Sequence, residues 1–154
     1  MTDARFEDAD APLRLRAETP EDLAVLSALA QDAVATVGDA AWLPKRRRWA
    51  LLLSRFRWED APQAARARRP YERVRATLVV ENVLSVRARG LDLGAPATPF
   101  VVLSLGFEAG EDGAGTLRLA LAGGADVALA VEALEASLTD VARPHVARGL
   151  PRHE

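Results

Sequence analysis

Apolar and polar residues alternate along much of the chain, and this period of two predicts strands. The clearest example runs from Val74 to Arg89, where one face is apolar and is interrupted only by Asn82. Because successive strands joined by short turns run antiparallel, the pattern predicts an antiparallel sheet. The other alternating segments are residues 13–17, 33–43, 48–58, 99–107, 117–121 and 127–131.

One segment carries a helical period with a start signal. Thr19 can accept a hydrogen bond from a free backbone N–H, Pro20 suits the first turn, and Glu21 and Asp22 complement the helix dipole. The sequence therefore predicts a helix to about Gln31. Its inward face comprises Leu23, Leu26, Leu29, Ala30 and Ala33.

Two segments allow two interpretations. Residues 132–142 have Leu134, Leu138 and Val141 at helical spacing, and we favour a helix there over a bulged strand because Ala and Glu are good helix formers. Residues 59–72 have no clear period, and we favour a loop over a short helix across residues 63–68.

The elements together predict an α+β fold. One helix in the N-terminal half, with a C-terminal helix as an option, covers only part of six to seven antiparallel strands. We therefore expect a strongly curved sheet or a partly open barrel, of which a pleckstrin-homology-like roll is one example. At 154 residues the chain fits one domain, which we assign to residues 12–143, with flexible tails at 1–11 and 144–154.

Composition narrows the chemistry further. The absence of cysteine excludes disulfides and thiolate chemistry, and the acidic N-terminus has no apolar segment typical of a secretory signal. No apolar stretch approaches the length of a membrane span. We expect a cytoplasmic protein with no membrane partner.

Catalytic patterns are not found in the sequence. The two histidines, His145 and His153, lie in the C-terminal tail, with no nucleophile elbow and no pair at metal-ligand spacing. The glycine-rich segment 110–115 lacks the Lys and Ser/Thr of a phosphate-binding loop. We predict no catalytic residue, no metal site and no cofactor.

Charge is distributed unevenly along the chain. Residues 45–89 hold 13 basic and 4 acidic residues, whereas the rest of the chain is acidic. Arginine-rich segments suit anions and acidic partners, although the acidic flanks disfavour a long nucleic acid. The candidate partner-binding or anion-binding residues are Arg55, Arg57, Arg66, Arg68, Arg69 and Arg73.

A second candidate site is centred on Glu81 and Asn82. Glu81 is embedded in apolar strand sequence, and the segment around it resembles the one around Glu132. Paired carboxylates can perform acid–base chemistry, but a cross-strand ion pair explains Glu81 more simply. Asn82 in the core-facing register indicates a bulge more than a ligand.

Several motifs resemble a small bacterial family, the domain of unknown function number 2948. They are Pro20–Ser27, Gln31–Ala33, Gly38–Asp39, Trp42–Pro44 and Arg55–Glu59, and the resemblance extends more loosely to later residues. It implies one compact bacterial domain and no particular chemistry.

Three functional hypotheses follow. The first is a non-catalytic module that binds a protein partner or a second copy of itself through the arginine-rich segment. The second is a small-ligand binder or small enzyme with a site at a barrel mouth, around Glu81 and Asn82. The third is an anion or nucleic-acid binder.

Overall fold

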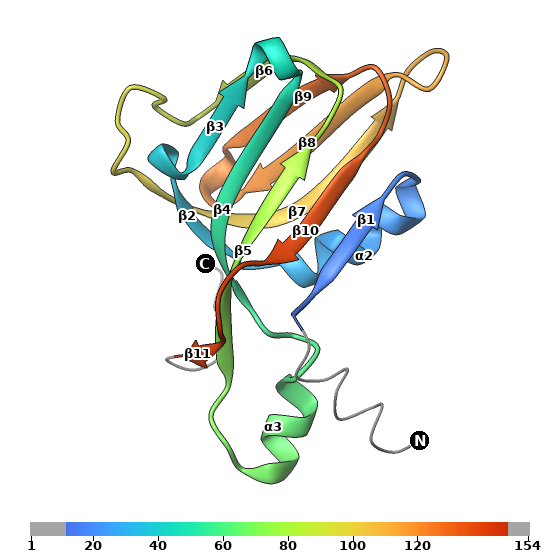
Figure 1. Cartoon of the computed structure of the whole chain (residues 1–154). Coiled ribbons are helices and arrows are strands. Elements are labelled where there is room, and N and C mark those ends of the chain that lie inside the picture. The colour runs from blue at the N-terminus through green and yellow to red at the C-terminus, as the bar shows by residue number, and fades with distance from the viewer. Residues whose placement is uncertain (1–11, 148–154) are drawn as a thin grey trace.

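The structure, a computed structural model, describes residues 12–147 and consists of strands with two α-helices and three short 3-10 helices (Figure 1). The predicted tail 1–11 and residues 148–154 lie outside the described residues. The elements in chain order are β1 (Arg14–Ala17), α2 (Pro20–Ala30), β2 (Val34–Thr36), η1 (Val37–Asp39), β3 (Ala40–Leu43), η2 (Pro44–Arg46), β4 (Arg48–Phe56), α3 (Ala61–Ala67), β5 (Glu72–Val80), β6 (Val83–Arg89), β7 (Pro99–Ala109), β8 (Gly115–Leu121), η3 (Ala122–Gly124), β9 (Asp126–Val131), β10 (Ala136–Asp140) and β11 (His145–Val146).

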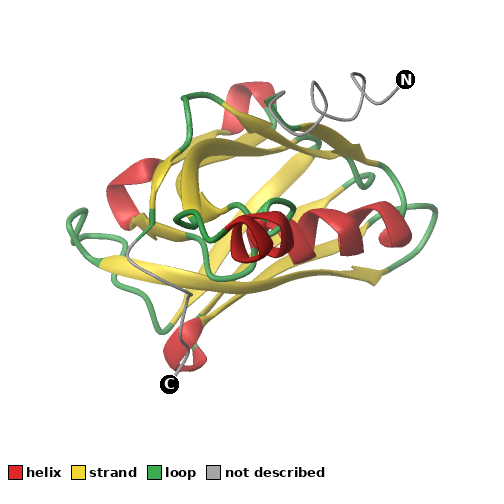
Figure 2. Cartoon of the chain, turned by 90° about the horizontal axis from the view of Figure 1, so that it is seen from below, coloured by secondary structure: helices red, strands yellow, loops and turns green. Residues whose placement is uncertain are grey.

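All strands belong to one antiparallel sheet that does not close on itself. Its order is β1-β10-β5-β4-β2-β7-β8-β9-β6, with β3 beside β4 and β11 beside β5. The sheet folds over so that its strands form two layers around the interior (Figure 2). The predicted antiparallel α+β architecture is confirmed, but the described residues contain eleven strands and not six to seven.

The strand predicted over residues 74–89 is bent at Asn82. This residue has a left-handed backbone conformation (φ +60°) that asparagine tolerates better than most residues, and it separates β5 from β6. A second bend, between β9 and β10, lies beside it: the Glu132 N–H donates to the Asn82 carbonyl and the Glu81 N–H donates to the Glu135 carbonyl, both at 2.9 Å. At these two bends the chain passes from one layer to the other. Each bend divides a continuous extended segment into two strands, β5 and β6 or β9 and β10, which is one reason why the number of strands exceeds the prediction.

The helix favoured for residues 132–142 is wrong, because residues 136–140 form β10 between β1 and β5. Leu134, Ala136 and Leu138 are buried, and they follow one another at the period of two that a strand requires. The middle position of this pattern is an alanine, a residue type that by itself favours a helix. Hydrogen bonding to strands on both sides outweighs the helix propensity of Ala and Glu.

The N-terminal helix is confirmed in detail. The Thr19 hydroxyl oxygen accepts a hydrogen bond from the Asp22 N–H at 3.1 Å, and Leu23, Leu26 and Ala30 are buried. The helix packs mainly against β7 and β1. It therefore covers one side of the space between the two layers (Figure 2).

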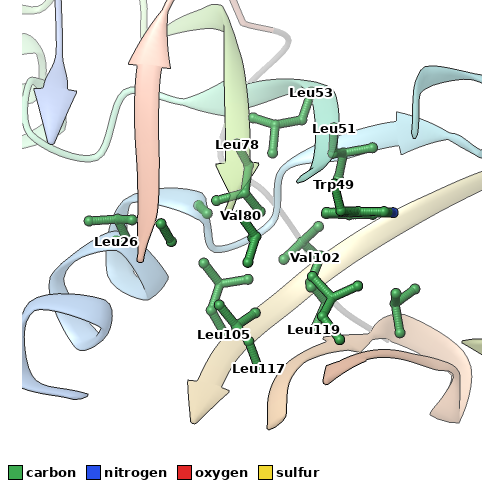
Figure 3. Close-up of a cluster of buried hydrophobic side chains, with 14 of the residues drawn as sticks. Leu26, Trp49, Leu51, Leu53, Leu78, Val80, Val102, Leu105, Leu117 and Leu119 are labelled. Carbon is green, nitrogen blue, oxygen red and sulfur yellow. The ribbon is translucent and has the colours of Figure 1, made fainter. Parts of the chain in front are cut away.

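The core is apolar and is supplied by both layers (Figure 3). Trp49, Leu51 and Leu78 from β4 and β5 face Leu117 and Leu119 from β8. No helix within residues 12–147 is long and apolar enough to cross a membrane.

The segment between β4 and β5 projects from one end of the sheet (Figure 1). It contains α3, so the short helix, and not the favoured loop, is present here. We call residues 57–71 the arm. The predicted tail from residue 144 begins within the described part, where β11 pairs with the start of β5 and the Ala147 N–H donates to the Tyr71 carbonyl.

Candidate functional site

Arg55 lies at the base of the arm and is fully buried. Its guanidinium donates two hydrogen bonds to Asp140, both 2.9 Å, and two to Glu59, at 2.9 and 2.8 Å. Burial alone would lower the pKa of Arg55, but the hydrogen bonds and charges of Glu59 and Asp140 together raise it above its ordinary value. The side chain is therefore a permanent buried cation, held between two carboxylates.

Asp140 connects three strands at this point. Besides Arg55 on β4, its carboxylate accepts a hydrogen bond of 2.9 Å from the Leu13 N–H, next to β1, while Asp140 itself ends β10. The Asp140 N–H donates in turn to the Leu13 carbonyl. One buried carboxylate thus fixes the ends of β1, β4 and β10 relative to one another.

A second group of ion pairs holds the arm itself. Arg69 donates to both carboxylate oxygens of Asp60, at 2.6 and 2.7 Å, and Arg57 pairs with Glu72 and lies 3.9 Å from Asp60. The hydrogen bond from Arg69 holds the pKa of Asp60 below its usual range, against the opposing effect of burial. These contacts join the start of the arm to its end. We call Arg55, Arg57, Glu59, Asp60, Arg69, Glu72 and Asp140 the anchor.

Aromatic side chains support the anchor. The rings of Phe56 and Trp58 are 4.6 Å apart in an edge-to-face arrangement, and Phe56 also lies 5.7 Å from the Tyr71 ring. The Trp58 indole N–H donates to the Gln31 carbonyl at 2.9 Å, next to the end of α2. The arm is therefore attached to the sheet by both polar and apolar contacts.

The structure divides the six candidate arginines into two sets. Arg55, Arg57 and Arg69 belong to the anchor, and Arg73 on β5 donates to the Ser54 carbonyl at 3.0 Å. Burial lowers the pKa of Arg73, an effect that the charge of Asp32 opposes. Of the six candidate arginines, Arg66 and Arg68 on the arm are the exposed ones.

The sequence pattern placed Arg55 and Arg57 on a strand face opposite Phe56 and Trp58. In the structure Arg55, Phe56 and Arg57 are all buried, because the end of β4 is covered on both sides at the base of the arm. Strand alternation distinguishes two faces, but it does not show that both are covered.

An open cleft of about 440 Å³ adjoins the anchor. Its walls include Arg57 and Asp140 from the anchor together with the exposed Val141 and Arg143. Within residues 12–147 no three carboxylate or histidine side chains are grouped to hold a metal ion.

Glu81 and Asn82 lie at the other end of the sheet from the arm, at the bend between β5 and β6. Glu81 pairs with Arg48 at 3.0 Å and borders an open hollow of about 230 Å³. The two similar segments, around Glu81 and around Glu132, do lie side by side in the structure. Their carboxylates do not form a pair, however, because Glu132 pairs with Arg47. Each carboxylate thus has its own arginine, as on an ordinary sheet face. His145 is exposed, and His153 lies outside the described residues.

Sequence reasoning missed the acidic half of the anchor. Glu59 lies four residues after Arg55, and Glu59-Asp60 directly follows the Arg-Phe-Arg-Trp motif, so local pairing could have been inferred. Asp140 is 85 residues from Arg55, and no local pattern connects them.

Comparison with known protein families gives a match over nearly the whole chain. A family model described as "Protein of unknown function (DUF2948)" matches residues 13–153. No curated protein matches the chain, and no solved structure does.

Proposed function

The chain belongs to the DUF2948 family of proteins of unknown function, and we propose that it is a non-catalytic interaction module whose arm contacts a partner protein. The observation that carries this proposal is the division of the arginines. Those at the base are neutralised by carboxylates, whereas Arg66 and Arg68 project into solvent. Within the described residues, no carboxylate forms an ion pair with either of them.

The anchor supports this role because it fixes the position of the arm. A buried ion pair contributes little net stability compared with apolar packing, but it defines the geometry of the segments that it joins. A binding element held in place before association loses less conformational entropy on binding. The anchor is thus suited to presenting Arg66 and Arg68 in a fixed arrangement.

The charge of the arm indicates the chemistry of the partner. Gln63, Ala65 and Ala67 are exposed neighbours of the two arginines, so the exposed surface of α3 and its C-cap is cationic and otherwise uncharged. Arginine forms bidentate hydrogen bonds with carboxylates, and we propose an acidic protein surface as the partner. Two arginines offer few phosphate contacts, which does not favour a nucleic acid.

Charge reversal on the arm tests this proposal. The tagged full-length protein and its R66E/R68E variant are used to purify partners from the cytoplasmic fraction of the source organism, because we propose a bacterial cytoplasm as the compartment of this protein. Because two ion pairs become repulsive contacts, we expect at least a tenfold loss of specific partners from the variant, measured by quantitative mass spectrometry.

The matched control is K45E/R46E, which makes the same charge change on two exposed residues of η2, at the other end of β4. The control should retain its partners. Equal recovery by all three proteins, or equal loss from both variants, would contradict the assignment of the arm. Recovery of the chain itself as the dominant partner would show self-association in place of a different protein.

A further inference from the structure

Strand β6, at one end of the sheet, has an edge that no other described strand covers. It ends the strand order and pairs only with β9, so one of its edges has no neighbouring strand. Beyond β9, the only backbone hydrogen bond of β6 within residues 12–147 is from the Val83 N–H to the Arg47 carbonyl. The edge from Leu84 to Arg89 thus presents unpaired N–H and C=O groups.

The two sides of β6 differ in chemistry. On the inner side, Val86 and Ala88 border a small apolar hollow of about 30 Å³, with Leu91 and Leu93 from the following loop. Leu93 is 59 % exposed, so this apolar surface continues outward beside the free edge. An apolar side chain on an added strand would cover it.

On the outer side, Arg87 and Arg89 border an open hollow of about 240 Å³ together with Arg118 from β8. Asp126 pairs with Arg89 at 2.6 Å and with Arg118 at 3.3 Å, and Arg118 also pairs with Glu108. Arg87 is exposed, and no carboxylate among residues 12–147 forms an ion pair with it. The hollow therefore has an excess of positive charge.

From this arrangement we propose that the free edge of β6 binds an extended segment of another protein in which apolar and acidic residues alternate. The backbone of the segment would hydrogen-bond to β6. Because successive side chains of a strand point to opposite faces, apolar residues would contact Leu91 and Leu93 while acidic residues would contact Arg87 and Arg89. This surface is separate from the arm, and the proposal does not depend on the function of the arm.

The other terminal strand lacks this combination. α2 packs against β1, and the cations of β1 are Arg14 and Arg16, of which Arg16 already pairs with Glu18 and Glu135. β6 is longer, and it alone of the two has an apolar hollow on one side and a cationic hollow on the other.

The test uses the full-length protein and a fluorescein-labelled peptide of three Val-Glu repeats, followed by fluorescence anisotropy. A peptide of three Val-Lys repeats and one with the same three Val and three Glu in two blocks are the comparisons. We expect the Val-Glu peptide to bind at least about tenfold more tightly than either. R87E should weaken its binding by at least about fivefold, whereas R14E, an equivalent change on β1, should not.

Hydrogen–deuterium exchange identifies the binding edge without a variant. Saturating peptide should slow exchange of the amides of residues 84–89 and leave those of β1 unchanged. The proposal is overturned by absence of binding at millimolar peptide, by equal affinity for the three peptides, or by protection elsewhere. It is also overturned if sedimentation shows a dimer in which the amides of residues 84–89 already exchange slowly without peptide. R66E/R68E should bind the peptide normally, so failure of the arm proposal would leave this result unaffected.

Discussion

At the scale of single residues, Arg55 combines complete burial with four hydrogen bonds to two carboxylates. A buried cation is costly to desolvate, and this cost is offset only when its partners are well placed. Asp140 is itself almost fully buried, whereas Glu59 is partly exposed to solvent. Loss of Arg55 would therefore leave Asp140 as a buried charge without its arginine.

We expect R55M to lower the free energy of unfolding by about 3 to 5 kcal/mol, because removing one partner of a buried ion pair leaves the other as an uncompensated buried charge. Urea denaturation measures the change, and R14M, at an exposed position, should alter stability by less than about 0.5 kcal/mol. The double variant R55M/D140L should be less destabilised than the sum of its single variants. Strict additivity would show that the two side chains are not coupled.

Asp60 gives a dependence on pH. Because the hydrogen bond from Arg69 lowers the pKa of Asp60 in the folded state, the stability that this pair contributes is present above the unfolded pKa, near 3.9, and is lost as pH falls through the folded pKa. D60N should cost about 1 to 2 kcal/mol at pH 7. The difference in unfolding free energy between wild type and D60N should shrink below about pH 4. A difference that stays constant down to pH 3 would contradict the ion pair.

At the scale of elements, the sequence predicted correctly those helices and strands that are determined by residues close together in the chain. The capped helix after Thr19 and strand β8, which was predicted over residues 117–121, needed no distant contact to be recognised. For residues 132–142 the strand was the less favoured alternative, because the two neighbours of β10, β1 and β5, come from distant parts of the chain. For the same reason the arginine-rich segment was identified, but its division into buried and exposed members was not.

The bend at Asn82 is the element that turns one predicted strand into two. N82G should leave stability unchanged within about 0.5 kcal/mol, because glycine adopts a positive φ without strain. N82V should cost about 1 to 2 kcal/mol, because a β-branched residue is strained there. Thermal and urea denaturation measure both. Similar destabilisation by the two changes would indicate that the asparagine side chain, and not the positive φ, determines stability at this bend.

At the scale of the whole molecule, the sheet carries two separate surfaces. The arm projects from one end and is held by the anchor (Figure 1), whereas the free edge of β6 has hollows of opposite chemistry on its two sides. The apolar core fills the space between the two layers (Figure 3). Because the arm and the β6 edge share no residue, binding at the two surfaces should be separable by substitution.

The most direct test of the central claim, that the arm contacts a partner protein, is site-specific photo-crosslinking in cells of the source organism. A benzophenone amino acid replaces Ala65 on the exposed surface of α3, or, as the control, Ala24 on the exposed surface of α2. We predict a discrete covalent adduct with an acidic protein from position 65, lost when R66E/R68E is added, and none from position 24. Equal adducts from both positions, or no adduct from position 65, would contradict the proposal.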